Sequence, residues 1–330
     1  MGPGDLNELV RPLLSIAGGD GRVLVGPETS DDAGVYLFEG HGLVATADFI
    51  TPVCDDARRF GRVAAANSLS DVFAMGGEVL FALNLCCFPE RGRTGVPDRE
   101  LGAILEGAAE TLAEAGGVIL GGHSVRDDEL KFGLAAVGRA DPERLLTNGG
   151  ARPGDRLLLT KPLGTGVLIN AFKLGKLGAD GLEEALTEME RLNAAASRLA
   201  LAHGARAATD ITGFGLAGHA LEMARGAGAT LRLRFADIPV LEGFHAMVRK
   251  RVTTDSTAAN RRHCRDAFDD RAGLAPGEAE VLFDPQTSGG LLLAIAPERA
   301  GELLDALREA GHRAAEIGAV AQGPARVEVV

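Results

Sequence analysis

The sequence predicts an α+β protein built from two mixed α/β domains. The chain has 330 residues, which is long for a single hydrophobic core. Patterns typical of strands and of helices alternate in both halves. Between the halves, the segment ARPGD at 151–155 is typical of a turn or linker. We therefore expect one domain over residues 1–152 and a second over residues 153–330.

In the first half of the chain, predicted strands alternate with two predicted helices. Residues 58–75 carry apolar side chains at helical spacing, and Gly76 and Gly77 would end that helix. A second amphipathic helix is expected over 98–115, ended by a further glycine pair. Short apolar runs predict strands at 42–47, 79–88, 118–120 and 131–138.

The second half repeats this mixture. Apolar runs predict strands at 156–160, 205–209, 280–284 and 290–296. Helices are expected at 164–175, at 182–203, from about residue 215, and at 297–310. Residues 253–277 are polar, and we expect them to form an irregular loop.

Charge and composition limit the classes of partner. The formal net charge is −12, which argues against nucleic acid or an anionic membrane as the main partner. No run of 18 apolar residues predicts a membrane-spanning helix. We expect a cytoplasmic enzyme. A chain this acidic needs a cation or local basic residues to hold a polyanion.

The four cysteines fit a reducing compartment. They are Cys54, Cys86, Cys87 and Cys264, and no two form a CxxC pair. Cys86 and Cys87 lie next to each other in an apolar run, so on a strand they would point to opposite faces. We expect buried thiols rather than a disulfide or metal framework.

Aspartates recur in unusual surroundings. Asp31 and Asp32 lie in a turn, Asp48 follows an apolar strand, Asp71 lies mid-helix among apolar residues, and Asp210 follows the 205–209 run. Taken singly, the pair could be a solvated turn and Asp71 could lie on an exposed helix face. Taken together, they favour a joint Mg²⁺–phosphate site, because this hard cation prefers oxygen ligands and bridges carboxylates to nucleotides. The sequence therefore favours an enzyme that uses ATP.

Glycine-rich segments supply candidate phosphate contacts. The segment GGHS at 121–124 follows a predicted strand, so backbone N–H groups could approach a phosphate, although a plain turn is the alternative. The segment KPLGTG at 161–166 starts a helix without being a Walker A loop. The segment DPQTSGG at 284–290 is either a tight connection or part of a pocket.

A literal GxGxxG lies at 213–218, with Asp237 downstream. This pattern is typical of dinucleotide-binding proteins, so hydride chemistry is an alternative. The preceding run at 205–209 is short and poorly apolar, and Asp210 stands where that fingerprint needs no acid. These departures favour the phosphate site over a dinucleotide site.

Together, the motifs resemble the selenophosphate synthetase (selenide, water dikinase) family, within the wider superfamily of aminoimidazole ribonucleotide synthetase. The resemblance covers nearly the whole chain in order: the run from Asp48 to Pro89, GGHS at 121–124, LTKPLGTGVL at 159–168, TDITGFGLAGHALEM at 209–223 and FDPQTSGGLLLA at 283–294. It implies synthesis of selenophosphate from ATP, selenide and water, with release of AMP and phosphate. It also implies a homodimer whose interface is a barrel that includes strands of the N-terminal domain.

The resemblance also implies residue roles. Asp32, Asp71 and Asp210 would hold Mg²⁺ against the phosphates. Asn67, four residues before Asp71 on the same helix, would orient the site. The residues implied to contact ATP are Thr29, Ser30, Asp31 and Asp48 from one subunit and Gly122, His123 and Ser124 from its partner. The family usually has a basic residue in place of Ser30, so a phosphate contact there is the least supported of these roles.

One family feature has no counterpart among the quoted motifs. The family begins with a glycine-rich segment that carries a reactive Cys or selenocysteine and then a Lys, whereas Met1 to Leu6 resembles the sequence after that Lys. We expect the natural chain to extend upstream, the alternative being a short paralogue. Without that segment we expect Mg-ATP binding with little or no selenophosphate synthesis. The alternatives are a related small-molecule kinase or synthetase, or a non-catalytic ATP-binding regulatory dimer.

Overall fold

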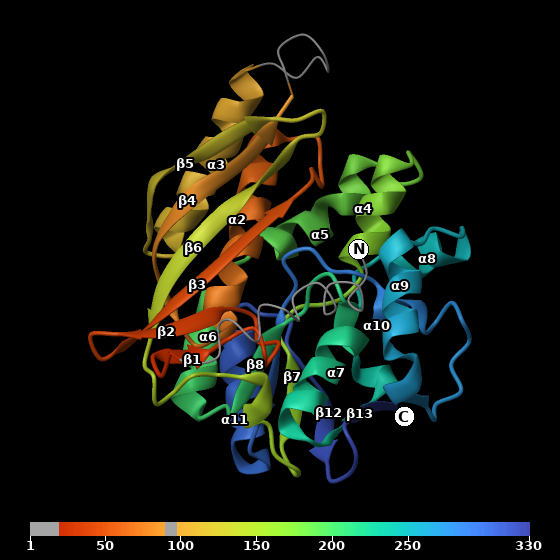
Figure 1. The fold of residues 1–330 in the computed structure, drawn as a ribbon. Coiled ribbons are helices and arrows are strands. Elements are labelled where there is room, and N and C mark those ends of the chain that lie inside the picture. The colour runs from red at the N-terminus through yellow and green to blue at the C-terminus, as the bar shows by residue number, and fades with distance from the viewer. Residues whose placement is uncertain (1–19, 90–97) are drawn as a thin grey trace.

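The computed structural model describes residues 20–89 and 98–330 of the chain, which fold around two β-sheets (Figure 1). The strands of the first sheet lie in the order β1-β2-β3-β6-β4-β5, and those of the second in the order β10-β13-β9-β12-β7-β11-β8. The strands are β1 (Val23–Val25), β2 (Gly34–Phe38), β3 (His41–Ile50), β4 (Glu78–Phe88), β5 (Val118–Arg126), β6 (Lys131–Ala140), β7 (Arg156–Leu159), β8 (Ala207–Asp210), β9 (Thr230–Leu233), β10 (Phe268–Asp270), β11 (Leu291–Ile295), β12 (Ala315–Ala321) and β13 (Arg326–Val329). The α-helices are α2 (Ala57–Ala74), α3 (Asp98–Glu114), α4 (Thr165–Lys173), α5 (Ala179–Glu190), α6 (Ala194–His203), α7 (Gly215–Ala227), α8 (Phe244–Arg249), α9 (Asp255–Cys264), α10 (Glu280–Phe283) and α11 (Pro297–Glu309).

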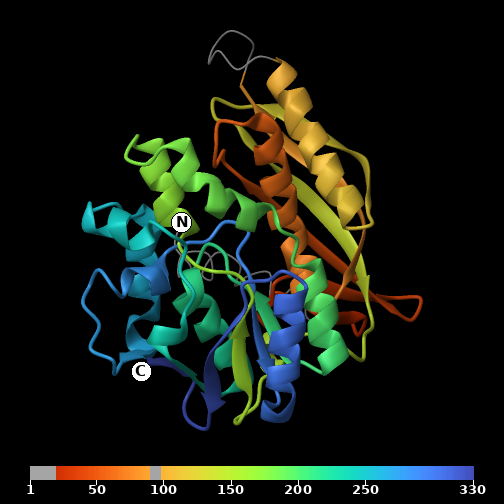
Figure 2. The ribbon, with the colours of Figure 1, turned by 180° about the vertical axis from the view of Figure 1, so that it is seen from behind.

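Helices α2 and α3 cover one face of the first sheet, as the view from behind shows (Figure 2). Two glycines allow the helices to approach closely. A Cβ on Gly61 would lie 2.0 Å from the backbone oxygen of Ile104, and one on Gly107 would lie 2.0 Å from that of Arg58. Any larger residue at either position would push the helices apart. Helix α2 therefore lies against both α3 and the sheet, which fixes the face on which its polar residues appear.

Among the described residues, no helix covers the opposite face of the first sheet (Figure 1). Along β3, buried Val44 alternates with exposed Phe49, as the two-residue period of a strand requires. Strands β4 and β5 add further exposed apolar side chains, namely Leu80, Leu83, Val118, Leu120 and Val125. Over residues 20–89 and 98–330 this sheet is open and does not close into a barrel.

The second sheet is covered on both faces, which explains its continuous apolar strands. In β11, Leu291, Leu293 and Ile295 pack into one core together with α6 and α11, while Leu292 and Ala294 belong to the larger core on the other side. A strand buried on both faces loses the alternation of apolar and polar residues. The predicted strands at 156–160 and 290–296 are confirmed as β7 and β11.

Several predicted elements differ from the structure. The helix expected at 182–203 is two helices, α5 and α6, separated at Arg191–Asn193. The strand expected at 280–284 is the helical turn α10, because a short apolar run fits a buried helix as well as a strand. The segment 253–277 is not an irregular loop: Thr254 caps α9 by accepting from Thr257 N at 3.2 Å.

Helix α2 also joins the two sheets. The side-chain nitrogen of Asn193, just before α6, donates to Ser70 Oγ and to Gly289 O, both at 2.8 Å. Ser197 Oγ donates to Phe73 O at 2.6 Å. These buried bonds hold the C-terminal half of α2 against the second sheet. Among the described residues, no helix combines the length and the apolarity needed to cross a membrane.

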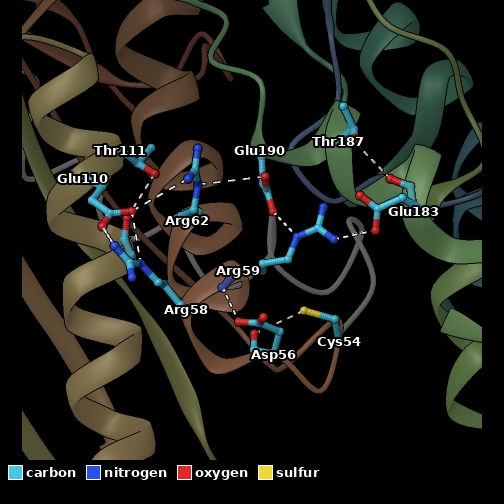
Figure 3. A network of polar contacts seen from close by, with 11 residues as sticks. Cys54, Asp56, Arg58, Arg59, Arg62, Glu110, Thr111, Glu183, Thr187 and Glu190 are labelled. Atoms are coloured by element: carbon cyan, nitrogen blue, oxygen red, sulfur yellow. Dashed lines mark hydrogen bonds and ion pairs between the residues drawn. The ribbon is translucent and has the colours of Figure 1, made fainter. Parts of the chain in front are cut away.

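The N-terminal end of α2 is tied to α5 by ion pairs (Figure 3). Arg59 Nε lies 2.5 Å from Glu190 Oε1, and Arg59 Nη1 lies 2.6 Å from Glu183 Oε2. The side chain of Glu190 is 17% exposed and that of Arg59 is 25% exposed, so solvent screens this pair less than a surface pair. By contrast, Arg58 pairs with Glu110 on α3, with both side chains more than a third exposed.

We predict that Arg59→Ala lowers the melting temperature more than Arg58→Ala does. The Arg59 change breaks a partly buried link between α2 and α5 and costs about 1–2 kcal/mol, whereas solvent screens the exposed Arg58 pair and its loss costs less. Thermal unfolding of both variants measures the difference. Equal effects would show that the α2–α5 ion pairs add nothing beyond an ordinary surface pair.

Candidate active site

Four of the predicted aspartates come together where the two sheets meet. Asp32 lies in the loop before β2, Asp48 in β3, Asp71 in α2 and Asp210 at the end of β8. Burial is the main cause that raises the pKa of Asp32, Asp48 and Asp71, and the charge of Asp210 raises each of them further. Side chains from four separate elements therefore repel one another in one enclosed region.

Few donors compensate these carboxylates. Thr209 Oγ1 donates to Asp32 Oδ1 at 2.9 Å, and Thr46 Oγ1 donates to Asp71 Oδ2 at 2.5 Å. The second oxygen of Asp32 and Oδ2 of Asp210 are buried without a hydrogen-bond partner among the described residues. Unpartnered buried oxygens are rare and costly. Their position fits a bound cation, and their chemistry fits a hard one such as Mg²⁺.

The aspartates are close together but do not form a complete metal site. In the described ranges 20–89 and 98–330, no three His, Cys, Asp or Glu side chains are placed to hold one metal ion. The predicted ligands Asp32, Asp71 and Asp210 therefore share a region without a preformed ligand cage. Mg²⁺ usually keeps waters and takes substrate phosphates as ligands, so a site of this type does not require a cage made by the protein alone.

Asn67 connects the aspartates to the second domain. Its Nδ2 donates to Asp48 Oδ2, and its Oδ1 accepts from Ser288 N at 2.9 Å. Asn67 contacts Asp48 and Asp71 contacts Thr46, both on β3, so the prediction that Asn67 and Asp71 share one face of α2 is confirmed. The prediction that Asp48 ends its strand was wrong, because β3 continues to Ile50. Asp48 is thus held inside a paired strand with its side chain toward α2.

The turn that carries Thr29, Ser30 and Asp31 is held from the other side of the site. Asn148 N donates to Asp31 Oδ1 at 2.7 Å, and Asn148 Nδ2 donates to Ser30 O at 2.9 Å. Ser30 adopts a left-handed backbone conformation with φ 53°. Thr29 and Ser30 are exposed. Burial is the main cause that raises the pKa of Asp31, despite its hydrogen bond from Asn148 N.

A cavity of about 530 Å³ lies beside this turn. Asp31, Asp32 and Thr46 line it together with Pro27 and Tyr36. Its volume is within the usual range for small-molecule sites. The site therefore has room for a ligand next to the carboxylates.

The GGHS segment does not lie in a turn. Gly121 to Ser124 lie within β5, at the edge of the first sheet, and the Cα partners of Gly122 and His123 on β4 are Asn84 and Leu85. A Cβ on Gly122 would lie 2.3 Å from Asn84 O, so close pairing with β4 accounts for that glycine. Strands β6 and β4 separate β5 from β3. Within one chain, Gly122, His123 and Ser124 are therefore not brought to the aspartates.

The DPQTSGG segment caps a helix instead of leaving its amides free. Gln286 Oε1 accepts from Gly164 N at 2.9 Å and from Thr165 N at 3.1 Å, and Asp284 Oδ2 accepts from Gly166 N at 3.1 Å. The start of α4, which resembled an anion site in the sequence, is thus occupied by side chains of the same chain. Burial raises the pKa of Asp284 to about 8.

Sequence analysis missed the role of Lys161. The side chain is fully buried, and its Nζ donates to Arg191 O at 2.6 Å and to Ser288 O at 2.8 Å. Burial lowers the pKa of Lys161 to about 7. These bonds hold the 284–290 segment, whose Ser288 N contacts Asn67. A lysine two residues after the buried leucines of β7 was the signal that could have identified it.

The GxGxxG segment does not have the structure of a dinucleotide site. Strand β8 pairs antiparallel with β11 at the edge of the sheet, whereas the dinucleotide fingerprint belongs to a parallel βαβ unit. His219 on α7 is buried, with Nδ1 3.0 Å from Glu222 Oε2 and Nε2 3.2 Å from Thr212 Oγ1. Sequence analysis also missed this buried contact between α7 and the residues after Asp210.

Cys54, Cys86 and Cys264 lack the properties of a reactive thiol. Burial raises the pKa of Cys54 and of Cys86 to about 11 and that of Cys264 to about 12. A thiol with a raised pKa holds little thiolate at neutral pH. The expectation of buried thiols is confirmed for Cys86 and Cys264, whereas Cys54 and Cys87 are only half-buried.

Comparison with known proteins identifies the family. Two domain models match: AIR synthase related protein, N-terminal domain, over residues 30–140, and AIR synthase related protein, C-terminal domain, over residues 152–330. The selenide, water dikinase of Geobacter metallireducens is 46% identical over 321 residues, covering 97% of this chain and 92% of the relative. The chain belongs to the selenide, water dikinase family. A second member, from Nitratidesulfovibrio vulgaris, is 45% identical over 320 residues, covering 96% of this chain and 91% of the relative.

Solved structures with the same fold are more distant in sequence. Thiamine monophosphate kinase from Aquifex aeolicus superposes with a TM-score of 0.70 at 18% identity, covering 98% of this chain and 96% of that chain. Hydrogenase maturation protein HypE in complex with ATP superposes with a TM-score of 0.65 at 22% identity, covering 97% of this chain and 91% of that chain. These structures show that the chain shares its two-domain fold with both proteins.

We predict that Asp284→Asn flattens the pH dependence of folding stability between about pH 4 and pH 8. The pKa of the Asp284 carboxyl is 3.8 in the unfolded chain and about 8 in the folded protein. The contribution of the protonated carboxyl to folding stability is therefore complete below pH 3.8 and is lost as the pH rises toward 8. Asparagine resembles the protonated acid and does not ionise. Urea unfolding from pH 4 to 8 measures this, with exposed Asp55→Asn as the control. The same slope in Asp284→Asn and wild type would contradict a protonated Asp284.

Proposed function

We propose that this chain carries out ATP-dependent synthesis of selenophosphate from selenide and water, with AMP and phosphate as the other products. The observation that carries the proposal is about 45% identity to selenide, water dikinases over nearly the full chain. The enclosed aspartates support it, because cleavage of two phosphoanhydrides requires charge neutralisation at several phosphate oxygens.

Asp32, Asp71 and Asp210 are the residues we propose to hold Mg²⁺. The unpartnered oxygens of Asp32 and Asp210, and the repulsion between the carboxylates, support this assignment. When bound, Mg²⁺ would supply electrostatic stabilisation of charge on the phosphate oxygens. Thr46 and Thr209 hold one oxygen each of Asp71 and Asp32, which leaves the other oxygens for the ion.

The nucleotide would occupy the cavity beside the Thr29–Asp32 turn. Asp31 is fixed there by Asn148, and Asp48 is fixed by Asn67. Asn67 also contacts Ser288 of the C-terminal domain, and Asn148 belongs to the segment that leads into that domain. Relative movement of the two domains would therefore change the positions of Asp31 and Asp48. In our proposal Thr29, Ser30, Asp31 and Asp48 contact ATP, and Asn67 orients Asp48.

A second copy of the chain would complete the site. The open face of the first sheet carries a row of exposed apolar side chains, which is typical of an interface. Pairing of two such faces would bury it, form the expected barrel and bring the partner's β5 edge toward a nucleotide. Gly122, His123 and Ser124 would then contact ATP from the partner. We also propose that the N-terminal domain, which forms this interface, ends at residue 152 and that the C-terminal domain begins at residue 153.

The proposed activity is tested by product analysis. We predict selenide-dependent AMP and orthophosphate from ATP, and a loss of about 100-fold or more in Asp71→Asn with exposed Asp55→Asn as the matched control. The assay compares this chain with a version that also carries the glycine-rich Cys-Lys segment that the family resemblance implies, and the selenide-dependent products are predicted for the version with that segment. ADP as the sole product, in either form, would indicate a kinase-like relative. Nucleotide binding without turnover in both forms would indicate a regulatory dimer.

We predict that Leu83→Glu in β4 converts a dimer into a monomer. A charge on the apolar face would be desolvated between two sheets at a cost of several kcal/mol. Arg198→Glu on α6, outside this face, is the control. Sedimentation velocity measures both variants. A wild-type monomer, or a Leu83→Glu dimer, would rule out this face as the interface.

A further inference from the structure

A second cavity lies in the C-terminal domain, away from the aspartates. It has a volume of about 480 Å³, and every residue that lines it lies between positions 253 and 283. None of the candidate active-site residues contributes to it. Its walls are α9, α10 and the chain between them. Most of this region belongs to residues 253–277, which the sequence predicted to be an irregular loop.

Three arginines line this cavity. Arg261 and Arg265 are four residues apart, at helical spacing, and Arg262 lies between them. Arg261 is 3.5 Å from Glu280 Oε2, whereas Arg262 and Arg265 form no ion pair with any carboxylate of the described residues. Both are exposed. Unneutralised arginines side by side repel each other, and in a chain of net charge −12 they form a local positive site.

The acidic residues that line the cavity are already engaged. Asp270 accepts from Gly273 N and Leu274 N, each at 2.9 Å, through its two separate oxygens. Glu280 Oε1 accepts from Thr253 Oγ1. These carboxylates therefore leave the guanidinium groups of Arg262 and Arg265 available to an anion.

The floor of the cavity is apolar and aromatic. The ring centroids of Phe268 and Phe283 are 5.0 Å apart, and Leu274 adds an aliphatic surface. Arg261 Cζ lies 4.6 Å from the centroid of Phe283, so this guanidinium is held over a ring. A ligand here meets aromatic and aliphatic side chains together with charge-assisted donors.

We propose that this cavity binds a small organic anion in which a phosphate group is attached beside a flat ring, the chemistry of a nucleoside monophosphate. The arginines bind the phosphate, and the ring packs against Phe268 and Leu274. The volume is sufficient for such a molecule and lies within the usual range for ligand sites. This site is independent of the proposed dikinase reaction.

Phenyl phosphate is the probe, because it carries the two required groups without the features of ATP. Ligand-observed NMR with the full chain measures its dissociation constant, and inorganic phosphate and benzyl alcohol provide the anion-only and ring-only comparisons. We expect phenyl phosphate to bind at least about tenfold more tightly than either. Arg262→Ala/Arg265→Ala should weaken it by about tenfold or more.

The control is Arg198→Ala/Arg249→Ala, which removes two exposed arginines that also form no ion pair with described carboxylates. It should leave the dissociation constant unchanged. Melting temperatures of both double variants verify folding. Undiminished binding in Arg262→Ala/Arg265→Ala, or equal affinity for phenyl phosphate and inorganic phosphate, would overturn the proposal. Failure of selenophosphate synthesis would leave this result unaffected, because the cavity shares no residue with that site.

Discussion

Repulsion between enclosed carboxylates is the constraint on which this architecture depends. Asp32, Asp48 and Asp71 belong to the N-terminal half of the chain and Asp210 to the C-terminal half, and the charge of Asp210 raises the pKa of the other three. Without a cation or bound protons, this arrangement opposes docking of the two sheets. The hydrogen bonds between the two domains oppose that repulsion.

Helix α2 is the element that makes the docking possible. One of its faces packs on the first sheet, and its polar positions reach the second domain through Asn67, Ser70 and Arg59. Lys161 then holds the Ser288 backbone that contacts Asn67. The carboxylates are therefore held by hydrogen bonds of both kinds: those of Asp48 and Asp71 lie within the N-terminal domain, and that of Asp32 comes from Thr209 in the C-terminal domain. This explains why residues far from the cavity contribute to its shape.

Much of this could be predicted from the chain. The stop of α2 at the Gly76–Gly77 pair, the buried strands β7 and β11 and the convergence of the aspartates follow from periodicity, glycine and the cost of a lone carboxylate. The failures have physical causes. The three-residue apolar run at 281–283 fits a strand or a helical turn, and glycines in GGHS permit a turn or a close strand pair. Lys161 could not be placed because its partners are backbone carbonyls more than 25 residues away.

The central claim is that the aspartate cluster binds a divalent cation together with ATP. Calorimetric titration of the protein with a nonhydrolysable ATP analogue, with and without Mg²⁺, tests it most directly in buffers of different ionisation enthalpy. Burial and mutual repulsion raise the pKa of Asp32 and Asp71, and a bound cation would lower it again, so we expect binding to require Mg²⁺ and to release protons to the buffer. Binding that is the same without Mg²⁺, or that releases no protons near neutral pH, would contradict it.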